Sequence, residues 1–291
     1  MKPLTILPAD HGYFSTSDKV KLHYIDKGQG QPLVMLSSWT LCSRQFEYQI
    51  LGLCQKYRVI ALDMRGHGQS QQVDYGYKIY RFAKDLHEFF EFLSLDKITA
   101  LGHSVGGSVV LCYWELFNGR RLAKLVLLDR PSLTISNPSW TPEQVKHFGA
   151  GMDENTAVEI NNMIAGSGGA QYKGVLLNCM LTPPISLYSR QCLLDSSQIV
   201  PEQQSATLFY DDVHQDWRSV LKRINVPTLI IAGRASPISL SSLQWLQAQI
   251  KDAELVIFEE YEGGKHFPFL ENSMKFNRVI DNFMQQALGD A

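Results

Sequence analysis

The chain has 291 residues, of which 45% are hydrophobic, and its 27 basic and 29 acidic side chains leave a net charge of −2 at pH 7. That length and composition suit one large buried core, and the lack of a basic surplus argues against nucleic acid or an acidic membrane surface as a partner. Five cysteines without a CxxC pair argue against a disulfide framework or a zinc site, and no apolar run approaches the roughly 18 residues of a membrane span, which predicts a cytoplasmic protein.

The first 130 residues alternate between strand-like and helix-like patterns. Apolar or alternating runs predict strands at 19–26, 33–36, 58–63, 97–103 and 124–129, the first with a hairpin partner near 13–15. Helical patterns occupy 44–55, 79–93 and 104–117. This alternation is the signature of βαβ units, and it predicts the α/β class with a mostly parallel central sheet flanked by helices.

The alternation stops at Pro131 and resumes at Pro227. Between these prolines the pattern is mixed, and helical fragments are predicted at 141–148, 153–164 and 185–194. Strands follow at 227–232 and 253–258, and helices at 240–250 and 274–288. We interpret residues 131–218 as a helical cap inserted over the carboxyl edge of the sheet, and residues 1–130 and 219–291 as the core that carries it.

The strongest motif is Gly102-His103-Ser104-Val105-Gly106, where the predicted strand 97–103 runs into a predicted helix. It matches the G-x-S-x-G pattern of a nucleophile elbow. The glycines remove side chains that would collide across the sharp turn, so that Ser104 projects over the sheet edge while the amino end of the helix faces a developing oxyanion. Ser104 is therefore the candidate nucleophile; the alternative is that its hydroxyl only caps the helix.

A second motif, Gly263-Gly264-Lys265-His266-Phe267-Pro268, lies between the last predicted strand and the last predicted helix. This position places His266 on a loop at the same edge of the sheet as the elbow. Because the pKa of an imidazole lies near neutrality, His266 is the candidate general base. His23, on an early strand, and His67, in an Arg-Gly-His-Gly turn, are expected to have structural roles.

Together, the elbow, the segment DMRGHGQS at 63–70 and the segment GGKHFPFLEN at 263–272 resemble the α/β-hydrolase superfamily. More narrowly, they are similar to its esterase, lactonase and cofactor-free haloperoxidase-like branch. The resemblance covers the chain outside 131–218. It implies the α/β-hydrolase fold, with the cap as the lid of the substrate pocket, and a chemistry that needs no cofactor and no metal.

The acid that would orient the histidine departs from the commonest pattern in this superfamily. Many relatives carry it in a Gly-x-x-Asp pattern after the strand equivalent to 227–232, where this chain has Gly233-Arg234-Ala235-Ser236. Moreover, no Asp or Glu occurs between Asp216 and Asp252. The usual position for the acid is therefore occupied by other residues.

Asp129, at the end of a predicted strand, is the remaining candidate for the acid. Haloalkane dehalogenases and cofactor-free quinolone-ring dioxygenases are similar in carrying their acid after this earlier strand. The order Ser104, Asp129, His266 obeys the order of a hydrolase triad, and a triad histidine needs an orienting acceptor. The alternative is that Asp129 is a turn residue before Pro131.

The oxyanion hole also departs from the relatives, which commonly have His-Gly where this chain has Ser37-Ser38-Trp39. We expect the main-chain amides of Val105 and Trp39 to be the two donors, because backbone amides need no particular side chain. The indole of Trp39 either enters the pocket or is an ordinary core aromatic. Further side chains are expected to line a pocket for an apolar or aromatic compound, namely Trp39, His103, Phe148, Met152, Met180, Tyr188 and Phe267.

Three functions remain open. The first is a cofactor-independent serine hydrolase that cleaves a carboxylic ester or lactone of a small apolar or aromatic compound through an acyl-enzyme. The second, suggested by the resemblance, is a cofactor-free dioxygenase of a hydroxylated heteroaromatic ring, with His266 as base and Ser104 as a hydrogen-bonding group. The third is a non-catalytic ligand receptor, against which the Ser, Asp and His candidates argue. Dehalogenation is disfavoured because its nucleophile is a carboxylate.

Overall fold

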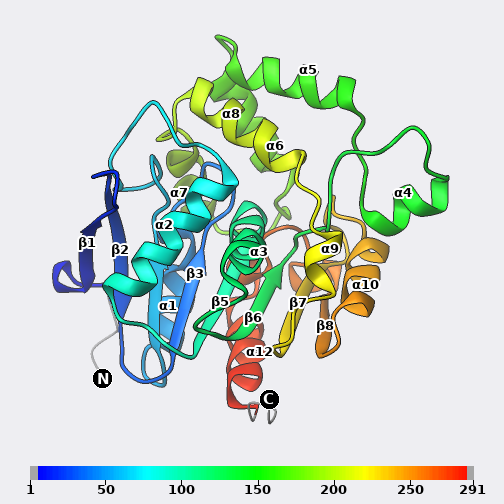
Figure 1. Cartoon of the computed structure of the whole chain (residues 1–291). Helices are drawn as coiled ribbons and strands as arrows, with labels where there is room; N and C mark the ends of the chain where they lie inside the picture. The colour runs from blue at the N-terminus through cyan, green and yellow to red at the C-terminus, as the bar shows by residue number, and fades with distance from the viewer. Residues whose placement is uncertain (1–5, 287–291) are drawn as a thin grey trace.

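The computed structural model describes residues 6–286 and has an eight-stranded sheet at its centre. The strand order is β1-β2-β4-β3-β5-β6-β7-β8; β1 and β2 run antiparallel to their neighbours, and the other pairs are parallel (Figure 1). The strands are β1 (His11–Ser15), β2 (Lys21–Lys27), β3 (Pro32–Leu36), β4 (Arg58–Leu62), β5 (Ile98–His103), β6 (Leu122–Leu128), β7 (Thr228–Gly233) and β8 (Ala253–Phe258). The predicted α/β class and mostly parallel sheet are confirmed.

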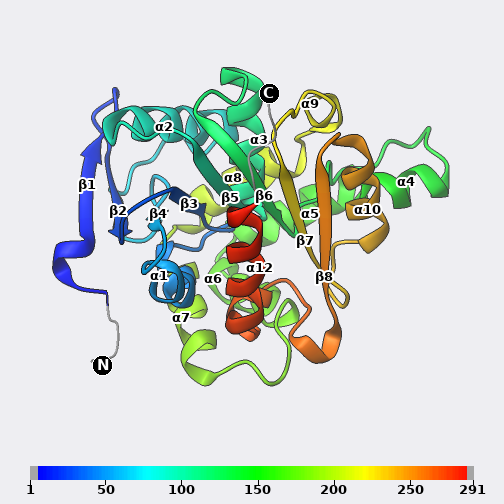
Figure 2. The ribbon, with the colours of Figure 1, turned by 90° about the horizontal axis from the view of Figure 1, so that it is seen from below.

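Helices cover both faces of the sheet, which explains why its central strands are apolar on both sides. Along β3, Val34 and Leu36 belong to one buried cluster, while Leu33 and Met35 belong to the other. In Figure 2, α1 and α12 lie on one face and α2 and α3 on the other. The covering helices are α1 (Glu47–Leu53), α2 (Ile79–Phe92), α3 (Val105–Phe117), α10 (Leu240–Gln249) and α12 (Ser273–Gln285).

Most predicted elements are present, with small shifts at their ends. The predicted helix 44–55 is divided into a 3₁₀ turn η2 (Ser43–Phe46) and α1. The last helix was predicted to reach 288, and residues 287–288 lie outside the described part of the chain. Three short turns that were not predicted complete the core, namely η1 (Pro8–Asp10), η3 (Glu260–Glu262) and α11 (Pro268–Glu271).

A helical insertion separates β6 from β7. Its helices α5, α6 and α8 lie across the end of the sheet at which β5 and β6 finish, whereas α4 packs beside α10 (Figure 1). The insertion contains α4 (Pro142–Phe148), α5 (Glu154–Ala165), α6 (Gly169–Cys179), α7 (Leu187–Ser197), α8 (Glu202–Val213) and, at its end, α9 (Arg218–Leu221). The helices α6, α8 and α9 were not predicted.

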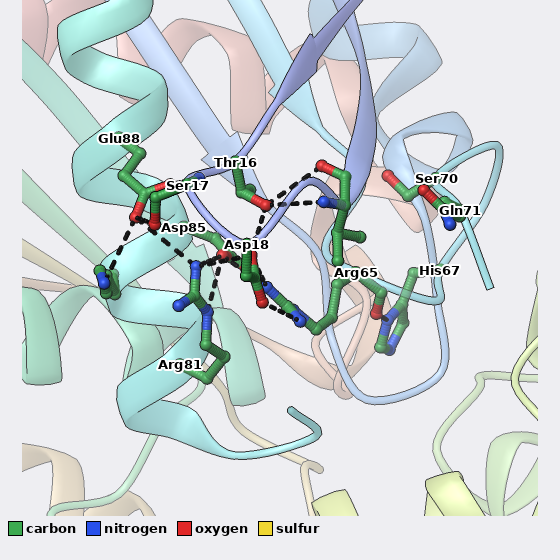
Figure 3. Close-up of polar contacts among 12 residues, drawn as sticks. Thr16, Ser17, Asp18, Arg65, His67, Ser70, Gln71, Arg81, Asp85 and Glu88 are labelled. Carbon is green, nitrogen blue, oxygen red and sulfur yellow. Dashed lines mark hydrogen bonds and ion pairs between the residues drawn. The ribbon is translucent and has the colours of Figure 1, made fainter. Parts of the chain in front are cut away.

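The segment 63–70 is held by a buried network around Arg65 (Figure 3). The fully buried guanidinium of Arg65 donates from Nε and Nη2 to the two carboxylate oxygens of Asp85, at 2.9 Å each, and also pairs with Asp18. Burial alone would raise the pKa of Asp18, but hydrogen bonds from Arg65 and Thr16 outweigh it and lower the pKa to about 2. The network joins the β1–β2 turn to α2 and to the loop after β4.

No helix within residues 6–286 is both long enough and apolar enough to cross a lipid bilayer.

Candidate active site

Ser104 lies at the turn between β5 and α3, with a backbone φ of 53° and ψ of −114°. These angles are unfavourable for a residue with a side chain, so the turn stores strain at this position. The flanking glycines are required by space: a Cβ on Gly102 would lie 2.3 Å from the carbonyl oxygen of Gly106, and a Cβ on Gly106 would lie 2.5 Å from that of Leu36. The motif therefore forms the sharp strand-to-helix turn that its sequence predicts.

His266 lies on the loop between η3 and α11, and its backbone is held from two sides. Its amide donates to the carbonyl oxygen of Met180 at 3.3 Å, and Nε2 of His103 donates to its carbonyl oxygen at 2.9 Å. Burial holds the pKa of His103 well below its usual range, so this ring is neutral. His103 therefore positions the His266 loop.

Asp129 is the partner of His266. Its fully buried carboxylate accepts a hydrogen bond of 2.6 Å through Oδ2 from Nδ1 of His266. The backbone of Asp129 has a φ of 49°, and its amide donates to the carbonyl oxygen of Ile231 on β7 at 2.8 Å. Because a carboxylate only accepts, Nδ1 carries the proton and Nε2 is left as the basic nitrogen.

Ser236 also binds this carboxylate. Its hydroxyl donates to Oδ2 of Asp129, the oxygen that His266 uses, and accepts from the amide of Ile238 at 3.1 Å. Ser236 occupies the position at which the Gly-x-x-Asp pattern of many relatives would place the acid. Its contact with Asp129 was not predicted, although the pattern itself drew attention to the position.

Ser104 and His266 line the same cavity, which has a volume of 220 Å³. In the described structure there is no hydrogen bond between the side chains of Ser104 and His266, although both residues line this cavity. The cavity lies beneath the helical insertion, and its apolar wall includes Pro131, Ile160, Leu176, Met180, Phe209 and Val213. Most of these residues come from α5, α6 and α8.

The two amides predicted for an oxyanion hole both belong to residues on the cavity wall. The amide of Val105 is the first of α3, where no intrahelical acceptor exists. Among the described residues, none accepts a hydrogen bond from the Trp39 amide. Trp39 itself lines the cavity, and its indole Nε1 donates to the carbonyl oxygen of Ser205 on α8 at 2.8 Å.

Four of the predicted pocket residues line the cavity, namely Trp39, Met152, Met180 and Phe267. The other three, His103, Phe148 and Tyr188, do not. His103 is buried behind His266, and Tyr188 is exposed on α7 and donates to Glu47 at 2.7 Å. Phe148 packs instead between Trp140 and Trp245, because α4 docks against α10.

Two charged residues on the cavity wall were not predicted. Arg130, which follows Asp129, donates from Nη1 to Oδ2 of Asp212 at 2.6 Å, and both side chains are buried. Arg130 and Asp212 are 82 residues apart in the sequence, and their pairing joins the end of β6 to α8. No local pattern indicates it. Within residues 6–286, no group of three or more His, Cys, Asp or Glu side chains is arranged to hold a metal ion.

Comparison with known proteins places this geometry in a family. The model of the alpha/beta hydrolase fold family matches residues 31–273. The chain is 30% identical to the non-heme haloperoxidase of Rhodococcus erythropolis, over 94% of this chain and 99% of that one. It is 27% identical to the bifunctional esterase/perhydrolase DCH of Acinetobacter calcoaceticus, over 87% and 93% of the two chains.

Among solved structures, the fold is similar to that of a bromoperoxidase from Bacillus anthracis, with a TM-score of 0.85 and 23% identity over 94% of this chain and all of that one. An esterase from Exiguobacterium antarcticum is equally similar, with a TM-score of 0.85 and 23% identity over 94% and 99%. Taken with the family match and the relative at 30% identity, these findings show that the chain belongs to the α/β-hydrolase family, in a group with esterase and haloperoxidase-like relatives, and is a hydrolase.

Proposed function

We propose that this protein is a serine hydrolase that cleaves a carboxylic ester or lactone of a small, largely apolar compound, with Ser104, His266 and Asp129 as its triad. The observation that carries the proposal is the 2.6 Å bond from His266 Nδ1 to the buried Asp129, with His266 on the same cavity as Ser104. That bond fixes the tautomer in which Nε2 accepts a proton.

In the proposed reaction, the Ser104 hydroxyl oxygen forms a bond to the substrate carbonyl carbon as His266 Nε2 takes its proton. The carbonyl oxygen becomes an oxyanion, which accepts hydrogen bonds from the amides of Val105 and Trp39. The intermediate collapses, the bond to the leaving oxygen breaks, and that oxygen takes the proton from His266. Water then attacks the acyl-enzyme with His266 as base, releasing the acid and restoring Ser104.

The helices within 131–218 act in this proposal as the cap that encloses the acyl or alcohol portion of the substrate. The apolar wall favours a compound with an aliphatic or aromatic body, since burial of such groups is favourable. The proposal places the enzyme in the cytoplasm, acting on a small molecule without a cofactor, nucleic acid or a membrane.

Labelling with a fluorophosphonate tests the nucleophile directly, because the probe forms a stable bond only with an activated serine. We expect one label, at Ser104, in the wild type and none in Ser104→Ala. A panel of activated esters and lactones then measures turnover. An unlabelled wild type that also leaves every ester intact would overturn the proposal.

One observation favours a second candidate, a cofactor-free dioxygenase of a hydroxylated heteroaromatic ring. Ser104 and His266 share the cavity without a hydrogen bond between them, and such a reaction requires only His266 as the base that removes the substrate hydroxyl proton. Turnover that stops without oxygen, and that persists in Ser104→Ala, would favour this candidate over the hydrolase.

A further inference from the structure

The residues from Ser37 to Leu41 form the loop after β3, which we call the oxyanion loop because it carries the Trp39 amide. The amide of Leu41 donates to the carbonyl oxygen of Ser38 at 3.1 Å, and the hydroxyl of Ser37 donates to that of Leu41 at 2.8 Å. The hydroxyl of Thr40 donates to the carbonyl oxygen of Trp39 at 2.7 Å. These bonds shape a tight turn, but they do not determine how the turn sits relative to the cavity.

The side chain of Trp39 joins the oxyanion loop to the helical insertion. Its indole Nε1 donates to the carbonyl oxygen of Ser205, near the start of α8, at 2.8 Å. The indole also packs edge-on against Phe209, one turn further along α8, with the ring centroids 6.1 Å apart. Residues four apart lie on the same face of a helix, so one face of α8 contacts both the nitrogen and the ring of this side chain. The two contacts together fix the position of the indole.

The start of α8, which accepts this bond, is itself held by α6. The carbonyl oxygen of Val200, just before α8, accepts from the hydroxyl of Ser205 at 3.1 Å and from the ammonium of Lys173 on α6 at 2.7 Å. The side chain of Lys173 is fully buried. At its other end α6 finishes beside Met180, whose carbonyl oxygen accepts from the His266 amide. Hydrogen bonds and two helices therefore connect the oxyanion loop to the loop that carries the base.

We propose that the indole of Trp39 is a positioning group, whose bond to Ser205 holds the Trp39 amide where the oxyanion forms. The inference rests on the proposed hydrolase function, and it gives the helical insertion a part in catalysis besides covering the pocket. Backbone amides stabilise an oxyanion only when they are aimed at the place it occupies in the transition state, at about 2.7–3.1 Å. Loss of the indole bond should therefore lower kcat and leave KM nearly unchanged, because the body of the substrate is bound elsewhere.

Two replacements of Trp39 remove the N–H group and keep an aromatic ring. One is Trp39→Phe, and the other is 3-benzothienylalanine at the same position, which keeps the bicyclic shape with sulfur in place of N–H. Each should lower kcat on an activated ester by about tenfold or more, up to the roughly 10²–10³ that loss of a whole oxyanion donor costs. Trp245→Phe is the matched control, because Trp245 lies on α10 and is not among the residues that line the cavity, and it should keep the wild-type kcat.

Inhibition by butylboronic acid gives a readout that a purely structural role would not move. The Ser104 oxygen bonds to boron as its proton passes to His266, and an oxygen of the tetrahedral adduct then lies where the oxyanion forms. The Ki of this acid should rise in each Trp39 variant by about the factor by which kcat/KM falls. The Ki of pentanamide, which forms no such adduct, should stay near the wild-type value. A Trp39 variant that keeps the wild-type kcat, or that weakens both inhibitors equally, overturns the inference.

Amide hydrogen exchange separates failure of this inference from failure of the hydrolase proposal. Because the indole bond joins the oxyanion loop to the start of α8, both segments should exchange faster in each Trp39 variant, while α12 keeps the wild-type rate. If no ester is hydrolysed but this paired increase is seen, the hydrolase proposal fails and the link between the loop and α8 stands. If exchange in the two segments is unchanged, the inference fails whatever the kinetics show.

Discussion

The imidazole of His266 donates to the carboxylate of Asp129 across 137 residues of sequence, from a loop after β8 to the end of β6. An amide in place of the carboxylate would favour the wrong imidazole tautomer. We therefore expect Asp129→Asn to lower kcat by about 10⁴-fold, the loss seen for this change in a serine protease. Ser236→Ala removes only a second hydrogen-bond donor to this carboxylate, so it should lower kcat much less. Steady-state kinetics on an activated ester measure both, and equal, mild effects would show that the acid lies elsewhere.

The contact of Ser236 with Asp129 predicts that the acid can be moved. Ser236 stands where many relatives carry the acid, and its hydroxyl reaches the oxygen that His266 uses. In Asp129→Asn/Ser236→Asp, the new carboxylate should reach His266 Nδ1 and recover about tenfold or more of the activity that Asp129→Asn loses. The control is Asp129→Asn/Ser236→Asn, which has no carboxylate and should recover none. Equal activity of the two double variants would contradict the prediction.

The strained backbone of Ser104 should separate activity from stability. Ser104→Ala and Ser104→Gly both remove the hydroxyl, and each should lower turnover by a factor on the order of 10⁶. Glycine accepts a φ of 53° without the steric cost that alanine and serine incur, so Ser104→Gly should be more stable than Ser104→Ala by about 1 kcal/mol. Urea unfolding measures the difference. A Ser104→Ala protein that keeps a tenth of wild-type turnover would rule out this residue as the nucleophile.

Two buried histidines should make the protein sensitive to mild acid. Burial lowers the pKa of His67 to about 4 and holds that of His103 well below its usual range. In the unfolded chain these histidines take up protons at about pH 6.5, whereas in the folded protein they stay neutral to a lower pH. The contribution of each histidine to folding stability is therefore complete above that pH. It is lost as the pH falls toward the pKa of the folded state. The free energy of unfolding should therefore fall by up to ~1.4 kcal/mol per pH unit for each histidine.

His67→Asn tests the contribution of His67 alone to the loss of stability in acid. His67 lies in the segment 63–70 and is not among the residues that line the cavity. Urea unfolding between pH 7 and pH 4 should show a shallower dependence in this variant than in the wild type. The same slope in both proteins would mean that His67 takes up its proton without unfolding.

The parts of the site that the sequence predicts are those that local sterics or chain order determine. The glycines around Ser104 are required by contacts within a few residues, and Asp129 followed from the absence of any acid between Asp216 and Asp252. The helices α6 and α8 were missed because one begins in a glycine-rich turn at Gly169 and the other is rich in polar residues. Six of the residues that line the cavity come from these helices and from α5, namely Ile160, Leu176, Leu177, Phe209, Asp212 and Val213.

The remaining differences between the predicted site and the structure arise from the way distant segments pack together. Phe148 was expected in the pocket because it is a large aromatic residue of the predicted cap, yet its helix packs on α10 and takes it away from the cavity. The pairing of Arg130 with Asp212 depends on where α8 crosses the end of β6, which no local pattern specifies. The sequence indicates which residues can react, whereas the shape of the wall depends on how the helices pack.

The two backbone bonds at His266 have a consequence for exchanging helices between relatives. His103 holds the carbonyl of His266 from the sheet side, while the carbonyl of Met180, at the end of α6, holds its amide. Lys265 adds bonds to the carbonyl oxygens of Cys179 at 2.8 Å and Leu181 at 3.1 Å. A chimera that receives the insertion of another family member would gain that member's pocket, yet its base would be misaligned unless the donor segment presented carbonyl groups at these three positions.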